Sequence, residues 1–177
     1  AGSKSISVNN VAPGIALGGA DSVDEGATYT LTLGAITDPG DDSVSSYVVH
    51  WGDGTDSTYT TGGDVTHVYA DGDASPTISV DLVDEDGTHT GAGSKSISVN
   101  NVAPGIALGG ADNVVEDTTY TLNLGAITDP GSDTVSSYVV DWGDGNSDTY
   151  ATGGDVSHTY ADPGNYDIRV DLVDEDG

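Results

Sequence analysis

The sequence repeats itself, and this repeat restricts what the chain can fold into more than any other feature. The segment from Tyr47 to Tyr69 returns, with few changes, as the segment from Tyr138 to Tyr160, 91 positions later. In a chain of 177 residues such a period predicts two similar domains in tandem. Each would have about a hundred residues, a normal size for a small independent domain.

The repeated segment itself predicts a strand with one buried face. Tyr47, Val49 and Trp51 occupy alternate positions, which is the spacing of side chains on one face of a strand. Trp51 has a tryptophan at the corresponding position of the second copy, whereas His50 is replaced there by Asp141. A buried position would hardly accept that exchange. We therefore expect Trp51 to point into the core and His50 to face water.

Alternation of this kind recurs along the first copy, and no segment shows the 3.6-residue period and capping residues of a helix. The sequence therefore predicts an all-β protein. The side chains that we expect to face inward on the remaining strands are Tyr29, Leu31, Leu33, Val65, His67, Tyr69, Ile78, Val80 and Leu82.

The motif Tyr-x-Val-x-Trp-Gly-Asp-Gly, followed by His-x-Tyr, a turn and an alternating strand, resembles the PKD domain. The second copy follows that pattern closely from His158 to Tyr166, whereas the first copy is one residue longer between Asp71 and Pro76. The resemblance implies two immunoglobulin-like β-sandwich domains in an end-to-end array. It says less about function, because such domains serve as spacers and as binding modules in many settings.

The boundaries of the repeat suggest that the chain is one window of a longer assembly. Residues 1–8 return as residues 92–99, where they follow the last turn of the first domain. We therefore assign 1–8 to the closing strand of a preceding repeat, 9–99 to the first domain, and 100–177 to a second domain without its closing strand. The expected partners are neighbouring copies of the same repeat, in a head-to-tail fibre or a continuous array.

The net charge excludes several classes of partner. Asp and Glu total 30 against three Lys and Arg, which gives a formal charge of −27. Such a surface repels nucleic acid and anionic membranes. No apolar run approaches the roughly 20 residues that a membrane-spanning helix needs, so we expect no membrane insertion. The carboxylates can form a solvated acidic coat, gather around Ca²⁺, or do both.

Calcium is the expected metal because it takes six to eight oxygen ligands from carboxylates, amides and backbone carbonyls. In an immunoglobulin-like sandwich, three acidic or amide-bearing loops of each domain would lie at one end. Some PKD-like domains hold Ca²⁺ there, so the resemblance implies the same site. The candidate ligands are Asn9, Asn10, Asp38, Asp41, Asp42, Asp84, Asp86, Asn100, Asn101, Asp129, Asp133, Asp174 and Asp176.

A simpler interpretation competes with the functional one at several of these positions. Asp-Gly and Asp-Pro-Gly are ordinary turn formers, and their side chains often cap their own backbone. We expect Asp53 and Asp144, in the two Gly-Asp-Gly turns, to do only that. We expect His67 to be a packed core histidine with a backbone partner rather than a metal ligand.

Taken together, these patterns predict a structural protein and no enzyme. The chain has no Cys, and nothing in it marks a pocket that would separate the pKa values of two carboxyl groups. We expect a calcium-braced segment of a cell-surface fibre, matrix filament or adhesin stalk, located outside the cell or on its surface. The alternative is a carbohydrate- or protein-binding accessory module of a secreted hydrolase. A surface glycan or a host ligand is left open as a further partner.

Overall fold

The computed structural model describes residues 2–40 and 42–176, and in this part of the chain it contains strands and no helix. The chain divides into two compact units, unit 1 (Ala1–Asn100) and unit 2 (Asn101–Gly177). The predicted all-β fold in two tandem domains is therefore confirmed.

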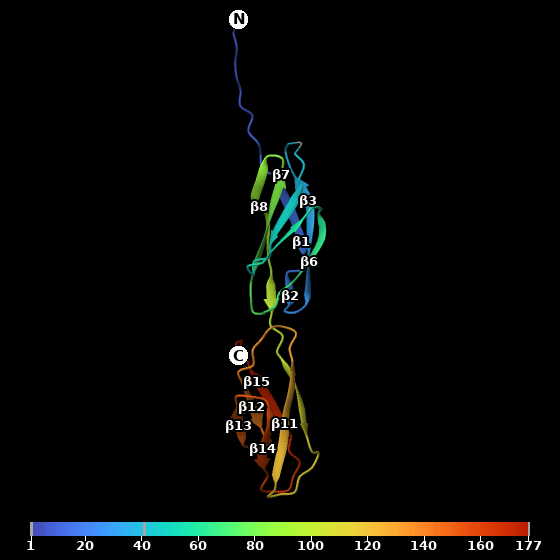
Figure 1. Cartoon of the computed structure of the whole chain (residues 1–177), viewed down its shortest axis with the longest axis vertical. Helices are drawn as coiled ribbons and strands as arrows, with labels where there is room; N and C mark the ends of the chain where they lie inside the picture. Colours follow the sequence, from blue (N-terminus) through green and yellow to red (C-terminus); the bar gives the residue numbers. More distant parts are fainter. Residues whose placement is uncertain (1, 41, 177) are drawn as a thin grey trace. The chain divides into compact units, whose positions relative to one another are not determined.

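Unit 1 is a sandwich of two antiparallel sheets (Figure 1). One sheet has the strand order β1-β3-β6 and the other has the order β5-β4-β7-β8, while β2 pairs in parallel with β9. The strands are β1 (Gly14–Gly19), β2 (Ser22–Asp24), β3 (Thr28–Thr37), β4 (Ser46–His50), β5 (Asp56–Tyr59), β6 (Gly63–Val68), β7 (Thr77–Asp84), β8 (Gly87–Ser96) and β9 (Ser98–Asn100).

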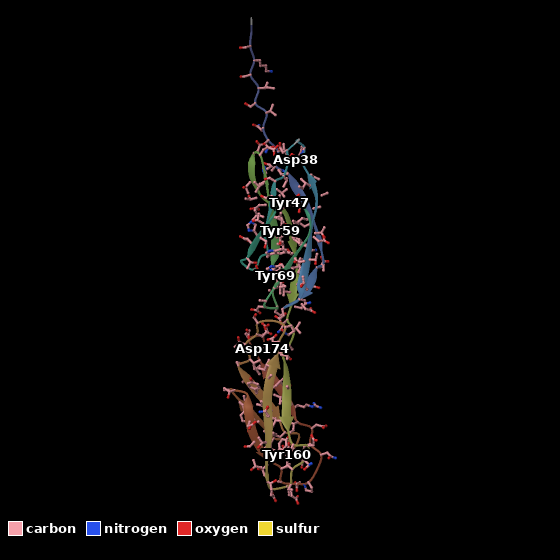
Figure 2. All side chains as sticks on the ribbon, turned by 45° about the vertical axis from the view of Figure 1, so that its right-hand side comes forward. Asp38, Tyr47, Tyr59, Tyr69, Tyr160 and Asp174 are labelled. Atoms are coloured by element: carbon pink, nitrogen blue, oxygen red, sulfur yellow. The ribbon has the colours of Figure 1, made fainter. Side chains whose placement is uncertain are left out.

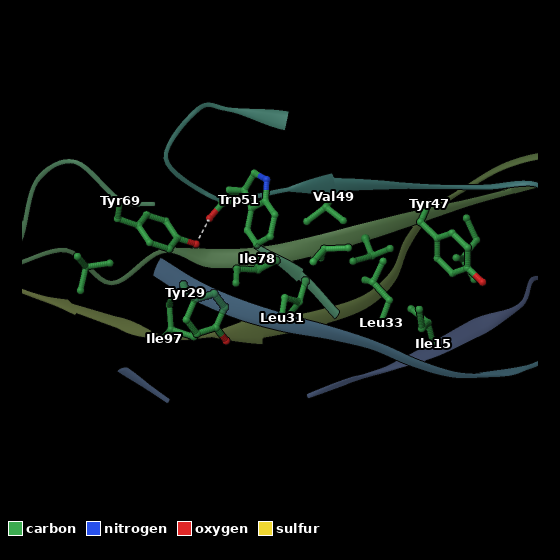
Figure 3. Close-up of a cluster of buried hydrophobic side chains, with 14 residues drawn as sticks. Ile15, Tyr29, Leu31, Leu33, Tyr47, Val49, Trp51, Tyr69, Ile78 and Ile97 are labelled. Carbon is green, nitrogen blue, oxygen red and sulfur yellow. Dashed lines mark hydrogen bonds between the residues drawn. The ribbon is translucent and has the colours of Figure 1, made fainter. Parts of the chain in front are cut away.

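The core of unit 1 lies between these two sheets and is built from the alternating positions of their strands. Trp51, Leu31 and Ile78 are fully buried, and the inward positions expected on β3 and β7 are confirmed. The Tyr69 hydroxyl donates a hydrogen bond to the backbone oxygen of Trp51 at 2.9 Å (Figure 3). This bond satisfies the only polar atom of a buried tyrosine side chain, which would otherwise cost free energy to desolvate.

The last two strands complete unit 1. β8 pairs antiparallel with β7 and covers what would otherwise be an edge of the second sheet. Ile97 and Val99, just after β8 and within β9, are both buried in the core. The backbone N–H of Ile97 donates to Pro76 O at 3.1 Å, and that of Val99 donates to Ala74 O at 2.9 Å.

Unit 2 repeats the first six principal strands of unit 1. Its sheets have the orders β10-β11-β14 and β13-β12-β15. Trp142 and Val140 are fully buried, as are their counterparts in unit 1. The strands are β10 (Gly105–Gly110), β11 (Thr119–Thr128), β12 (Ser137–Asp141), β13 (Ser147–Tyr150), β14 (Gly154–Thr159) and β15 (Arg169–Val173).

The described part of the N-terminal segment, residues 2–13, lies outside the sheets. Residues 2–13 form no strand, and the side chains of Ile6 and Val8 are exposed. Their assignment to the closing strand of another repeat remains a prediction.

Candidate metal centre

An acidic cluster lies where the two sheets of unit 1 meet at one end of the sandwich. Asp38 follows β3 of one sheet, Asp42 precedes β4 of the other, and Asp84 is the last residue of β7. Each offers one carboxylate oxygen, and the three oxygens lie within 4.8 Å of one another. Figure 2 places Asp38 at one end of this unit and Tyr69 toward the other. The structure therefore brings together three of the residues that the sequence predicted as calcium ligands.

Asp84 is the anchor of this cluster. Its Oδ1 accepts hydrogen bonds from the backbone N–H groups of Asp86 at 2.9 Å and Gly87 at 3.1 Å. Its Oδ2 lies 2.7 Å from Nε2 of His89. Burial alone would raise the pKa of Asp84, but the hydrogen bonds from His89 and the turn outweigh it and hold the pKa below its ordinary value. Asp84 is therefore held as a carboxylate.

Asp38 and Asp42 are less well satisfied. Oδ1 of Asp38 accepts from the backbone N–H of Gly40 at 2.9 Å, whereas its Oδ2 is buried without a hydrogen-bond partner among the described residues. Burial and the nearby carboxylates, first of all Asp38, raise the pKa of Asp42. A buried acceptor without a donor, next to a carboxylate that is repelled by its neighbours, is the environment that a cation would relieve.

A glutamate that the sequence did not suggest links the two loops of this cluster. Oε2 of Glu85 accepts a hydrogen bond from the backbone N–H of Ser43 at 2.9 Å. In unit 2, Oε2 of Glu175 accepts from the backbone N–H of Thr134 at 2.7 Å. The only sequence signal was that both copies carry Glu within the Asp-Glu-Asp-Gly turn.

The other predicted ligands of unit 1 that the structure describes are exposed, and one of them is hydrogen-bonded to another side chain. Asn9 and Asn10 are exposed in the N-terminal segment, and Asp86 is exposed in the turn after β7. The side-chain amide of Asn100 donates to Oδ1 of Asp24 at 2.9 Å. Asp41 falls outside the described residues.

Unit 2 carries a related set of carboxylates. A carboxylate oxygen of Asp133 lies within 4.8 Å of one of Asp129 and, in a second group, within 4.8 Å of one of Asp176. Oδ2 of Asp129 and the side-chain oxygen of Asn101 are buried without a hydrogen bond within the described part of the chain. Asp174 accepts a hydrogen bond from the backbone N–H of Asp176 at 3.1 Å, as Asp84 does in unit 1.

The predicted roles of His67 and Asp53 need correction. His67 stacks on the Trp51 ring, with centroids 4.6 Å apart and planes 8° from parallel, and its Nε2 lies 2.6 Å from Oδ2 of Asp53. Its partner is thus a carboxylate and not a backbone group. Asp53 does cap its own turn, since its Oδ1 accepts from the backbone N–H of Thr55, but it also holds the histidine. Burial opposes ionisation of Asp53, yet the bonds from Thr55 and His67 keep its pKa below the ordinary value.

Unit 2 has the same arrangement. His158 stacks on Trp142 at 4.7 Å, and its Nε2 lies 2.7 Å from Oδ2 of Asp144. The hydrogen bond from His158 is the main reason that the pKa of Asp144 is lowered. Because each Asp lies in the turn after a core tryptophan, the pair fixes that turn against β6 or β14 and is structural.

The architecture defines a class: immunoglobulin-like β-sandwich units with acidic loops at one end. Residues 101–177 match the family model of the PKD domain. The match covers unit 2, and unit 1 repeats the sequence and strand register of that unit. PKD domains are typically non-catalytic modules of extracellular proteins.

No curated protein matches the chain. Among solved structures, fibronectin(III)-like modules of CbhA from Clostridium thermocellum match with 18% sequence identity and a TM-score of 0.38, over 92% of this chain and 86% of that chain. No helix in the described residues is long and apolar enough to cross a bilayer.

Proposed function

We propose that this chain is a structural segment of an extracellular repeat protein, a fibre, filament or stalk, and that Ca²⁺ braces its sandwich units. The observation that carries the proposal is the group formed by Asp38, Asp42 and Asp84, whose oxygens lie within 4.8 Å of one another. Carboxylate oxygens are the ligands that Ca²⁺ prefers, and carbonyls and waters can complete the shell.

The cluster has the position that a brace requires. Asp38 follows a strand of the first sheet, while Asp42 and Asp84 adjoin strands of the second. An ion held by all three would therefore link the two sheets where the Glu85 bond already holds the loops together. In unit 2 the corresponding ligands would be Asp129, Asp133, Asp174 and Asp176, and Asn101 is a further candidate ligand.

Electrostatics supports a divalent cation at this place. The raised pKa of Asp42 shows that its ionised form is disfavoured by burial and by the carboxylates around it. A bound divalent cation would favour the ionised form of Asp42, because its positive charge offsets the repulsion from the neighbouring carboxylates. Extracellular calcium modules bind at about 10⁻⁴–10⁻³ M, which suits a site made of few protein ligands.

Calorimetric titration of the chelator-treated chain with Ca²⁺ tests the proposal. We expect binding in the range above, and at ten times the dissociation constant one site stabilises the fold by about 1.4 kcal/mol. The variant Asp42→Asn removes one ligand, and Asp73→Asn is its matched control. Asp73 is exposed, and its positive φ of 45° is a conformation that Asn also tolerates.

The expected outcome is that Asp42→Asn weakens binding while Asp73→Asn does not. Sodium chloride at high concentration should not imitate Ca²⁺, since it screens the acidic surface without occupying a site. Absence of binding heat, together with a melting temperature that chelator does not change, would refute the calcium brace.

A further inference from the structure

A row of polar side chains crosses the outer face of the second sheet of unit 1. Asp56 lies on β5, His50 on β4 and Asp81 on β7. Nδ1 of His50 lies 2.7 Å from Oδ1 of Asp56, and Nε2 of the same ring lies 3.1 Å from Oδ2 of Asp81. Oδ1 of Asp81 accepts a hydrogen bond from the backbone N–H of Gly91, on β8, at 2.8 Å. The row therefore connects all four strands of this sheet.

Strand alternation and register bring these side chains together. Val49 and Val80 are fully buried between the sheets, so the neighbouring His50 and Asp81 point to the outer face. Asp56 lies directly opposite His50 in the register of β4 and β5. Asp81 lies on the diagonal from His50 in the register of β4 and β7. Direct and diagonal neighbours on one face of a sheet are both within reach of a long side chain.

The contact with Asp56 determines which ring nitrogen of His50 carries a proton. A carboxylate can only accept a hydrogen bond, so Nδ1 must donate in the 2.7 Å contact with Asp56. In a neutral imidazole, a proton on Nδ1 leaves Nε2 with a lone pair. A carboxylate that orients a histidine through one nitrogen while the other nitrogen binds a metal ion is common at protein metal sites.

The contact with Asp81 requires a positive charge between the two side chains. Burial opposes ionisation of Asp81, but the hydrogen bonds from Gly91 and His50 keep its pKa below the ordinary value, so it is a carboxylate at neutral pH. Two lone pairs that face each other repel, so either a proton or a metal ion must lie between them. In the metal-free chain a proton lies there, and the hydrogen bonds to Asp81 and Asp56 accordingly raise the pKa of His50.

The distance between Nε2 and Oδ2 suits two ligands of one ion. Ligand atoms about 2.1 Å from Zn²⁺, at an angle of about 90–110°, are roughly 3.0–3.4 Å apart. The observed separation is 3.1 Å, whereas a hydrogen bond between charged groups is typically about 2.7–2.9 Å long. The contact with Asp56, at 2.7 Å, falls in that shorter range. Asp56 therefore holds the ring, and Asp81 lies at the distance of a second ligand.

We propose that His50 and Asp81 together bind a divalent transition-metal ion such as Zn²⁺, and that Asp56 positions the histidine. Imidazole nitrogen is a ligand that Zn²⁺ and Cu²⁺ accept readily, whereas Ca²⁺ prefers oxygen. Water would complete the coordination, since the side chain of His50 is 37% exposed. The ion takes the place of the proton on Nε2, and that proton is released to the solvent.

An ion at this place would act within one sheet. It would join β4 to β7, and the bonds to Asp56 and Gly91 would extend the connection to β5 and β8. The proposed calcium brace instead links the two sheets through Asp38, Asp42 and Asp84. The two sites share no residue, so either proposal can fail while the other holds.

Unit 2 serves as an internal comparison. Asp141 and Ser147 occupy the positions of His50 and Asp56, in the same strand register. Without the imidazole, this position of unit 2 has no nitrogen ligand to offer. We therefore expect one ion of this kind per chain, bound to unit 1.

A titration of the chelator-treated chain with Zn²⁺, followed by nitrogen NMR of the histidine side chains, tests the proposal. Zn²⁺ should shift the signal of Nε2 of His50 and leave Nδ1 protonated. The signals of His50 are identified by their loss in His50→Gln. The rings of His67 and His158 should not respond, because each is stacked on a tryptophan and paired with an aspartate. Ca²⁺ at the same concentration should not shift Nε2 of His50.

Three variants separate the roles of the row. Asp81→Asn removes a carboxylate ligand but keeps an oxygen for the N–H of Gly91, and it should abolish the shift of His50. Asp56→Asn should weaken Zn²⁺ binding by about 10–100-fold, the usual effect of losing a residue that orients a ligand, and should still allow the shift at saturating Zn²⁺. The matched control is Asp73→Asn. It removes one negative charge from an exposed position and should leave Zn²⁺ binding unchanged.

Three results would overturn the proposal. Zn²⁺ could leave the signals of His50 unchanged throughout the titration. Asp81→Asn could bind Zn²⁺ at His50 as tightly as the wild type does. Zn²⁺ could shift His67 and His158 as strongly as His50, which would show that the ion binds without preference for this row. The two Asp→Asn variants of the row keep the test decisive even if His50→Gln fails to fold.

Discussion

Ile6 and Ile97 occupy the same position of an identical segment, yet Ile97 is buried in the core of unit 1 and Ile6 is exposed to water. The difference arises from the surroundings, because the local sequence is the same in both places. Burial of this segment therefore depends on the groove that receives it.

This pair gives a direct mutational comparison. Ile97→Ala should destabilise unit 1 by about 2–5 kcal/mol, the usual cost of truncating a buried isoleucine. Ile6→Ala should change the free energy of unfolding by less than about 0.5 kcal/mol, as expected at an exposed position. Denaturant unfolding at concentrations where the chain is monomeric measures both. Equal effects of the two substitutions would show that the burial of Ile97 contributes little.

The core tryptophans should be structural. Trp51→Ala or Trp142→Ala should each cost about 3–5 kcal/mol, because a fully buried large aromatic is lost. The stacked histidine would also lose its support. Thermal unfolding followed by circular dichroism measures the change. An unaltered melting temperature would mean that these rings do not hold the two sheets together.

His50 should make unit 1 sensitive to pH. Hydrogen bonds to Asp81 and Asp56, at 3.1 and 2.7 Å, raise the pKa of His50. A histidine whose pKa is raised by folding makes its full contribution to stability at pH values below its unfolded pKa of about 6.5. That contribution is lost as the pH rises through the folded pKa.

The variant His50→Gln measures this contribution by difference from the wild type. The stability advantage of the wild type over His50→Gln should be largest in mildly acidic solution and should shrink as the solution becomes alkaline. Unit 2 has Asp141 at this position, so it supplies an internal control. A difference that does not vary with pH would contradict the assigned ion pairs.

The effect of Asp42→Asn on the melting temperature should change sign when calcium is added. Without Ca²⁺, removing a carboxylate whose ionised form is disfavoured should raise the melting temperature, because its repulsion with Asp38 and its neighbours disappears. With saturating Ca²⁺, the wild type should be the more stable protein. Differential scanning calorimetry in chelator and in Ca²⁺ gives the four values needed. If the variant has the same effect in both solutions, Asp42 is not a ligand.

The strands could be predicted from the sequence because each is amphipathic by itself. The alternation in Tyr47, Val49 and Trp51 places their side chains on one face, and all three are buried. The convergence of Asp38, Asp42 and Asp84 could be expected from the sandwich topology. The fold and part of the site were therefore accessible from local patterns and from the repeat.

Contacts between distant side chains could not be predicted in the same way. The bonds of His67 to Asp53 and of Glu85 to Ser43 depend on how two turns approach each other in space. The bond from the side-chain amide of Asn100 to Asp24 depends in the same way on the parallel pairing of β9 with β2. Such contacts depend on the register in which the strands pair, and the alternation of apolar residues does not determine that register.

The central claim is that Ca²⁺ braces unit 1 through Asp38, Asp42 and Asp84, and hydrogen–deuterium exchange tests it most directly. The chain is measured in chelator and in saturating Ca²⁺. We expect Ca²⁺ to slow exchange at residues 38–40, 42–45 and 85–87, and to leave the turn at residues 52–55 unchanged, because that turn carries none of the three carboxylates. Exchange that Ca²⁺ does not slow at residues 38–40, 42–45 and 85–87, or that it slows equally at residues 52–55, would contradict the account.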